Sequence, residues 1–209
     1  KKDTSSNVFE TFVKLTDKYL YDPNSPLRNE DHYAFFASHL ASSDLVEPLM
    51  QEKYARIVRL AALNRVGTKA ADFRFADKKG RIFTLYGIKA ELTLLFFSNP
   101  GCTACKDIID VLNNDPVISG LIADGTMKVL NIYIDEDLEA WRSYMPIYPE
   151  TWYNGFDPDL VIRGETLYNV RAIPSLYLLD HDKRVIMKDA PEGRLFDWLS
   201  GVTQMTAAQ

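Results

Sequence analysis

Hydrophobic positions in the first third of the chain recur at the spacing of helices. In the first 20 residues they fall on one helix face, at Phe9, Phe12, Val13, Tyr19 and Leu20. Residues 22–26 interrupt this pattern, and Tyr33, Phe36 and Leu40 resume it. A third helix is expected from Asp44, paired with Glu47 in a capping box, to Gly67. We therefore predict an all-helical N-terminal domain over residues 1–66, with these stripes in its core.

After Ala70 the pattern changes to the two-residue alternation that is typical of strands. Residues 72–75 and 81–85 alternate in this way on either side of a turn that contains Gly80. Glycine supplies the positive φ that a tight hairpin turn requires. We expect this hairpin to open the second domain, over residues 67–209.

Two longer apolar runs, residues 92–97 and 127–134, predict buried inner strands. The chain between them is long enough for a helical crossover, so the two strands should run parallel. A loop-rich insertion is expected over about residues 135–168. The remaining elements are expected to be a strand, a turn, a second strand and a helix, at residues 174–179, 180–183, 184–188 and 191–199.

The only two cysteines, Cys102 and Cys105, follow the first inner strand and open the crossover helix. A helix N-terminus favours a thiolate over a thiol, so Cys102 is the candidate nucleophile. One helical turn brings Cys105 back toward it, within reach to resolve a mixed disulfide. This pattern predicts a redox-active pair that needs no cofactor and no metal.

Other uses of a Cys-x-x-Cys pair fit the sequence less well. A closed zinc site needs two more ligands, and His32, His39 and His181 lack the usual spacing. Lys106 follows the pair where a c-type haem site has histidine. A purely structural disulfide remains open as an alternative.

Composition narrows the class of partner. The 209 residues are 46% hydrophobic and carry a net charge of −5, which argues against nucleic-acid binding and anionic membrane surfaces. No apolar run has the length of a membrane span. The chain begins with Lys1 and not Met, so we expect a mature form from which an export signal has been removed.

Two motifs together resemble the thioredoxin fold. Ser98-Asn99-Pro100-Gly101-Cys102-Thr103-Ala104-Cys105 follows one inner strand, and Ala172-Ile173-Pro174-Ser175 precedes another. With the hairpin and the insertion, the chain is similar to the TlpA/ResA-type thiol-disulfide oxidoreductases of the bacterial cell envelope. The helical domain is similar to an N-terminal domain of unknown function on some of them. The fold class expected is therefore α/β, with a thioredoxin-like central mixed sheet flanked by helices.

This resemblance implies a role for Pro174, with a cis peptide bond before it that faces the cysteines. A proline there has no N–H, which leaves the backbone of Ile173 free to pair with an incoming peptide. Substrate would then bind at Ile173 and beside Gly101, and Pro174 would keep metals from the thiols.

The chain departs from the resemblance at two positions. Gly101 replaces the aromatic residue, usually tryptophan, that precedes the first cysteine in most relatives, and Phe96 occupies the position of thioredoxin's buried carboxylate. Asp107 is a candidate substitute for proton transfer, and Lys106 for thiolate stabilisation, although both residue types are also common on a solvated helix surface.

The insertion is rich in aromatic residues, for which two interpretations exist. They are Trp141, Tyr144, Tyr148, Trp152, Tyr153 and Phe156. Such residues can form a rim that receives a partner protein. We favour packing for most of them, because long loops over a sheet often bury a cluster of their own.

The function expected is exchange of electrons with protein disulfides, more as a reductase than as an oxidase, because Thr103 and Ala104 add no charge to the motif. The clients would be protein disulfides or dithiols in the periplasm or cell envelope, and electrons would come from a thioredoxin-like or membrane protein. Two alternatives stay open. One is a non-catalytic binding or assembly module. The other is a peroxiredoxin-like peroxidase, although the offsets of Pro100, Thr103 and Cys105 do not match.

Overall fold

The computed structural model describes residues 7–206 and divides the chain into two compact units. One unit ends at Ala62 and the other begins at Leu63, four residues before the expected boundary. The side chain of Asn64 gives the reason. It donates to the carbonyl of Leu167 at 2.9 Å and accepts from the N–H of Ala71 at 2.8 Å, so it belongs to the second unit.

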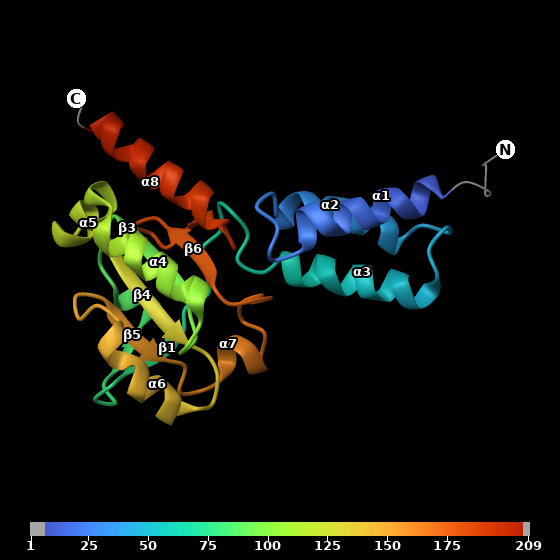
Figure 1. Ribbon diagram of the computed structural model, residues 1–209. Helices are drawn as coiled ribbons and strands as arrows, with labels where there is room; N and C mark the ends of the chain where they lie inside the picture. Colours follow the sequence, from blue (N-terminus) through green and yellow to red (C-terminus); the bar gives the residue numbers. More distant parts are fainter. Residues whose placement is uncertain (1–6, 207–209) are drawn as a thin grey trace. The chain divides into compact units, whose positions relative to one another are not determined.

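The first unit is helical. Its elements are α1 (Val8–Thr16), a π-helical turn η1 (Asp17–Tyr21), α2 (Glu30–Ala41) and α3 (Pro48–Ala61), drawn in blue to teal in Figure 1. Its core consists of Tyr33, Ala37, Leu40, Tyr54 and Ile57. The capping box expected at Asp44 is wrong, because α3 begins at Pro48, whose fixed φ suits the first helical position.

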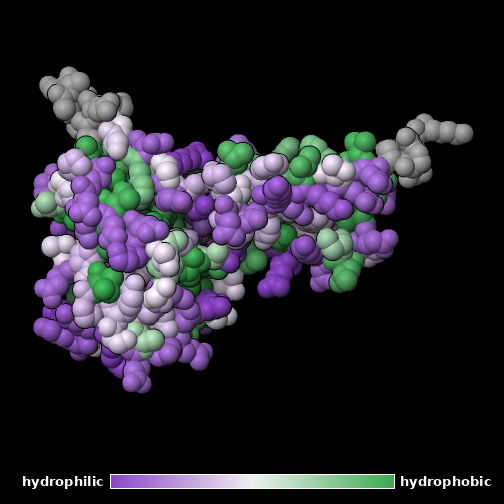
Figure 2. All heavy atoms as spheres, viewed as in Figure 1, coloured by the Kyte–Doolittle hydropathy of each residue, from purple (hydrophilic) through white to green (hydrophobic). Residues whose placement is uncertain are grey.

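Several apolar side chains of this unit face solvent. No residue of α1 is buried, and Phe9 and Phe12 are 37% and 57% exposed. The expectation that these two residues lie in the core is therefore wrong, although Val13 packs against the core. Figure 2 shows hydrophobic residues, in green, on the surface of this unit.

The second unit is built on one mixed sheet of seven strands, in the order β2-β1-β5-β4-β3-β6-β7. The strands are β1 (Arg74–Asp77), β2 (Ile82–Thr84), β3 (Leu92–Phe97), β4 (Met127–Tyr133), β5 (Tyr153–Phe156), β6 (Ser175–Leu179) and β7 (Val185–Met187). Strands β3, β4 and β5 run parallel, and β6 is antiparallel to β3. The predicted fold class is confirmed, including the hairpin, in which Gly80 has a φ of +76°.

Helices and short turns connect these strands. They are η2 (Leu85–Gly87), α4 (Thr103–Asn114), α5 (Pro116–Ala123), α6 (Leu138–Tyr144), η3 (Met145–Ile147), α7 (Val161–Gly164) and α8 (Glu192–Thr206). None of the helices within residues 7–206 combines the length and the apolar content that crossing a bilayer requires.

The central strand β3 is buried on both faces, and alternate side chains join different cores. Leu94 and Phe96 pack in the cluster that contains Cys105 of α4. Leu95 and Phe97 pack in the opposite cluster. Because successive side chains of a strand point to opposite faces, a run that is apolar except for Thr93 suits a strand that is buried on both faces. Figure 1 shows α4 and α5 in front of the strands.

The insertion contains more regular structure than its sequence predicts. It holds α6, η3, β5 and α7, and β5 pairs with both β4 and β1. The expectation of a loop-rich segment is therefore wrong. Strand β5 contains Asn154 and Gly155, two residue types that are depleted in strands, so its sequence carries little strand signal.

Candidate redox site

The cysteine pair lies where β3 passes through a tight turn into α4. The N–H of Cys102 donates to the carbonyl of Asn99 at 3.3 Å, which closes a turn with Pro100 and Gly101 at its centre. Gly101 has a φ of +73°, as the third position of a type II turn requires, and proline is common at the second. Local sequence therefore places Cys102 at the start of the helix.

The two sulfurs have different surroundings. Cys102 is the N-cap residue of α4, and its Sγ accepts a hydrogen bond from the N–H of Cys105 at 3.1 Å. Cys102 is partly exposed, whereas Cys105 is 1% exposed and lies in the core. They form a disulfide bond, with Cα atoms 5.2 Å apart. Once the pair is reduced, the N–H group and the helix N-terminus favour a thiolate on the accessible sulfur.

Pro174 comes to the same end of the sheet as this turn. Strands β3 and β6 pair antiparallel, with Phe97 opposite Ser175. The residues that follow Phe97 and those that precede Ser175 therefore leave the sheet together. The peptide bond between Ile173 and Pro174 is cis. Ile173 packs against both hydrophobic clusters, one of which contains both cysteines.

A buried polar network lies below the turn, and sequence reasoning missed it. Ser98 Oγ donates to Asn131 Oδ1 at 2.5 Å and lies 3.3 Å from the Tyr148 hydroxyl. Asn131 Nδ2 donates to Asn154 Oδ1 at 3.1 Å. Burial raises the pKa of Tyr148, against hydrogen bonds to Ser98 and Asn131 that lower it. The network is therefore uncharged at neutral pH.

Asn99 connects the turn to the segment after β4. Its Nδ2 donates to Asp135 Oδ2 at 2.8 Å, and Asp135 also forms an ion pair with Arg163. These contacts hold the turn from the side of the insertion. No sequence signal pointed to them, because the three residues lie far apart in the chain.

A solved structure from Bacteroides caccae, described as a thioredoxin-like protein, is similar to this chain over most of its length. It is 41% identical, the match covers 93% of this chain and 70% of that chain, and the TM-score is 0.87. The chain belongs to this thioredoxin-like family.

Further comparisons match the two units of this thioredoxin-like protein separately. The C-terminal domain of an uncharacterized protein from Bacteroides fragilis is 46% identical, over 66% of this chain and 98% of that chain, with a TM-score of 0.63. A conserved B. fragilis protein of unknown function is 37% identical, over 65% of this chain and 98% of that one, also with a TM-score of 0.63. Residues 1–64 match a family described as a domain of unknown function, DUF5106. No protein with a curated function matches the chain.

The departures from the thioredoxin resemblance are visible in the site. Phe96 is fully buried and packs in the cluster of Cys105. Lys106 and Asp107 are exposed on α4, and Lys106 pairs with Asp110 at 2.6 Å. A hydrogen bond and the charge of Asp110 raise the pKa of Lys106. Lys106 is thus engaged along the helix surface.

Most of the aromatic residues of the insertion pack inside the fold, as predicted. Trp141, Tyr148 and Trp152 are 0%, 3% and 6% exposed and belong to the cluster that contains Cys105.

Within residues 7–206, no group of three His, Cys, Asp or Glu side chains is arranged to hold a metal ion.

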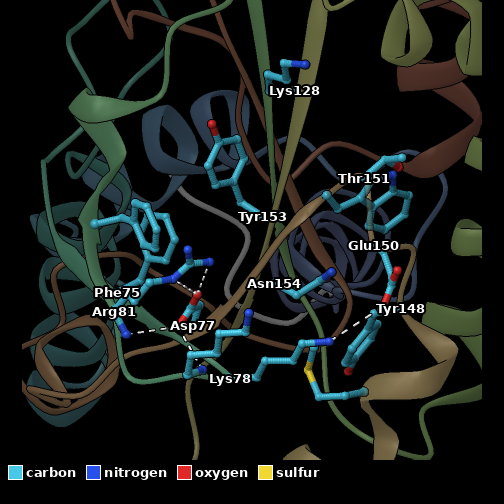
Figure 3. A pocket seen from close by; sticks show the side chains of 14 residues that line it. Phe75, Asp77, Lys78, Arg81, Lys128, Tyr148, Glu150, Thr151, Tyr153 and Asn154 are labelled. Carbon is cyan, nitrogen blue, oxygen red and sulfur yellow. Dashed lines mark hydrogen bonds and ion pairs between the residues drawn. The ribbon is translucent and has the colours of Figure 1, made fainter.

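A separate hollow of about 440 Å³ lies beside β1, β2 and β5, and none of the predicted site residues lines it. Figure 3 shows the Tyr153 ring in its middle, with Asp77 and Arg81 directed toward each other. Two of the four cationic residues that line it form ion pairs, Arg81 with Asp77 at 2.6 Å and Lys78 with Glu150 at 3.7 Å. The redox site therefore remains the arrangement with the clearest chemistry.

Proposed function

We propose that this thioredoxin-like protein is a thiol-disulfide oxidoreductase that reduces disulfide bonds in other proteins. The observation that carries the proposal is the asymmetry of the pair at the start of α4. Cys102 is accessible and its sulfur accepts an N–H hydrogen bond, whereas Cys105 is buried behind it. This arrangement suits one attacking and one resolving sulfur.

The exchange begins from the reduced pair. The Cys102 thiolate attacks one sulfur of a substrate disulfide, which forms a mixed disulfide and releases the other substrate sulfur as a thiolate that takes up a proton. Cys105 then loses its proton and attacks the Cys102 sulfur. The intramolecular disulfide forms, and the second substrate thiol leaves. Two electrons pass from the protein to the substrate, and a dithiol donor must restore the reduced pair.

Substrate docking is proposed at the segment before β6. The backbone of Ile173 would pair with an extended substrate peptide by strand addition, which brings the substrate disulfide to the sulfur of Cys102. The register that sets Phe97 opposite Ser175 supports this role. Gly101 adds no side chain on the approach to Cys102, so that side of the sulfur stays open.

Partners and compartment follow from this chemistry as parts of the proposal. A disulfide-forming pair that turns over with protein clients suits the periplasm or cell envelope of a bacterium. Electrons would come from another thioredoxin-like protein or from a membrane protein that presents a dithiol. The uncharged Thr103 and Ala104 between the cysteines favour the reductive direction, because neither of them adds a charge that would stabilise the thiolate.

Reduction of insulin disulfides by dithiothreitol tests the proposal. We expect the wild-type chain to accelerate the reaction and Cys102→Ser to return it to the uncatalysed rate, because the attacking sulfur is lost. Asn113→Ala, an exposed change on the same helix, is the matched control and should keep the wild-type rate.

Two other results would contradict this function. Equal rates for wild type and Cys102→Ser, both at the uncatalysed level, would leave a binding or assembly role for the fold. Rapid consumption of hydrogen peroxide that depends on the cysteines, without insulin reduction, would identify a peroxidase.

A further inference from the structure

A buried ion pair lies directly behind the segment that carries Pro174. Arg171 Nη2 contacts Asp189 Oδ2 at 2.7 Å, with side chains that are 9% and 6% exposed. The hydroxyl of Ser175, which is fully buried, donates to the other oxygen of Asp189 at 2.9 Å. One carboxylate thus contacts two residues on either side of the Ile173–Pro174 peptide bond.

We propose that Asp189 is a positioning residue for thiol-disulfide exchange, which through Arg171 and Ser175 fixes both ends of residues 172–174 beside Cys102. The inference rests on the proposed function and adds to it the group that fixes the substrate-docking segment. Asp189 does not contact the sulfurs. Its effect on the reaction passes through the backbone of Ile173.

The position of Asp189 is itself fixed by the fold. It lies between β7 and α8, and its backbone has a φ of +43°, a conformation that Asp and Asn adopt more readily than most residues. The next residue, Ala190, donates its N–H to the carbonyl of Leu176 in β6 at 3.0 Å. The carboxylate is therefore anchored to the strand that Pro174 precedes.

Burial of this pair is costly, which makes a purely stabilising role a weak explanation. Two charges that leave water lose their hydration free energy, and their mutual attraction often does not compensate for this loss. Proteins in which apolar residues replace such a pair are frequently as stable as the original protein. A carboxylate that contacts a different residue with each oxygen, in contrast, fixes the positions of those two residues relative to each other. One carboxylate with one oxygen on Arg171 and one on Ser175 restricts the docking segment more than packing alone would.

Comparison of a large and a small reaction partner separates positioning from general stability. Insulin would need the Ile173 backbone to dock, whereas dithiothreitol would reach the partly exposed Cys102 without it. We expect Asp189→Asn to lower the rate of insulin reduction by at least about tenfold. The rate at which dithiothreitol reduces the Cys102–Cys105 disulfide, followed by alkylation of the freed thiols, should stay within about twofold of wild type.

Asp189→Asn could fail to fold, because the buried charge of Arg171 then loses the carboxylate that it contacts. Two further variants test the proposal in that case. Ser175→Ala removes only the hydroxyl contact, and Arg171→Met with Asp189→Asn removes both charges. Both are expected to show the same selective loss with insulin. Asp159→Asn breaks an exposed ion pair with Arg74, in which the side chains are 40% and 58% exposed, and should change neither rate.

The two rates distinguish a failure of the positioning role from a failure of the proposed function. Insulin rates of these variants within about twofold of wild type, or equal loss of both rates, would overturn the positioning role while leaving the proposed function intact. A wild-type insulin rate no higher than that of Cys102→Ser would overturn the proposed function, and the positioning role with it.

Discussion

Gly101 directly precedes Cys102, the proposed attacking residue, and adds no side chain beside it. Apart from its chain neighbours, no heavy atom lies within 4 Å of the place where a Cβ would be, so space does not exclude a side chain. The φ of +73° disfavours one, because an L-residue in this region costs about 1–2 kcal/mol. A tryptophan here would carry this cost. Glycine therefore suits the turn before Cys102 better than an aromatic residue would.

Asp77 ties together the turn of the hairpin, and the fold lowers the pKa of its carboxyl. Burial raises the pKa of Asp77, but hydrogen bonds from the backbone and side chain of Arg81 and from the N–H of Lys79 outweigh it and lower the pKa overall. A carboxyl whose pKa is lowered on folding contributes stability above its unfolded pKa, about 3.9, and loses it as the pH falls through the folded value.

Asp77→Asn should therefore destabilise the protein by about 1 kcal/mol near neutral pH, with a smaller loss near pH 3, where the wild-type carboxyl also takes up protons. Urea unfolding of both proteins at the two pH values measures the difference. Asp159→Asn serves as the control. A loss for Asp77→Asn that is as large at the acidic pH would show that the charge is not the cause.

At single positions, the sequence revealed Cys102 and Cys105 but not Asp189 or Ser98. The cysteines have a spacing that carries chemical meaning by itself. Asp189 and Arg171 are 18 positions apart, and charged residues are mostly exposed in proteins. Nothing in the chain shows that these two are buried together.

The strand, turn and helix around the cysteines were predictable because they are contiguous. An apolar run, Pro100-Gly101 and the first helical residues succeed one another within a short segment. The second helix of the crossover, α5, also has a local signal, because Asp115 caps it through the N–H groups of Val117 and Ile118 and Pro116 begins it. Strand β5 has no such signal, and it lies between β4 and β1 and pairs with both.

Gly155 permits that placement. It lies in β5 opposite Ile132 of β4 and Asp77 of β1. A Cβ at this position would lie 2.7 Å from Phe75 Cδ2 and 2.9 Å from the carbonyl oxygen of Ala76. Because the second atom belongs to the backbone, it cannot move without disturbing the β1–β5 pairing.

Gly155→Ala should lower the free energy of unfolding by about 1–3 kcal/mol through overpacking. Chemical denaturation followed by circular dichroism measures the loss. Gly120→Ala, in helix α5 with no atom within 4 Å of its Cβ position, should be neutral or stabilising. A midpoint for Gly155→Ala equal to that of wild type would show that the two strands are not packed this closely.

Across the whole molecule, the order of strands creates the site. Strand β3 lies between β4 and β6, so Cys102 and Pro174 share one end of the sheet although they are far apart in the chain. The residues alone predicted both strands but not their pairing, and only the resemblance to the thioredoxin fold implied that Pro174 faces the cysteines. In the helical unit the sequence predicted the type of structure, but periodicity did not reveal that one apolar face of α1 is exposed.

In the proposed reaction Cys102 attacks and Cys105 resolves, and covalent trapping distinguishes these two roles. Reduced Cys105→Ser and Cys102→Ser variants are incubated with insulin, and disulfide-linked adducts are measured by mass spectrometry without reductant. We expect a one-to-one adduct through Cys102 in Cys105→Ser, released by dithiothreitol, and little adduct in Cys102→Ser because Cys105 is 1% exposed. Equal adducts in both variants, or an adduct only through Cys105, would rule out this assignment of roles.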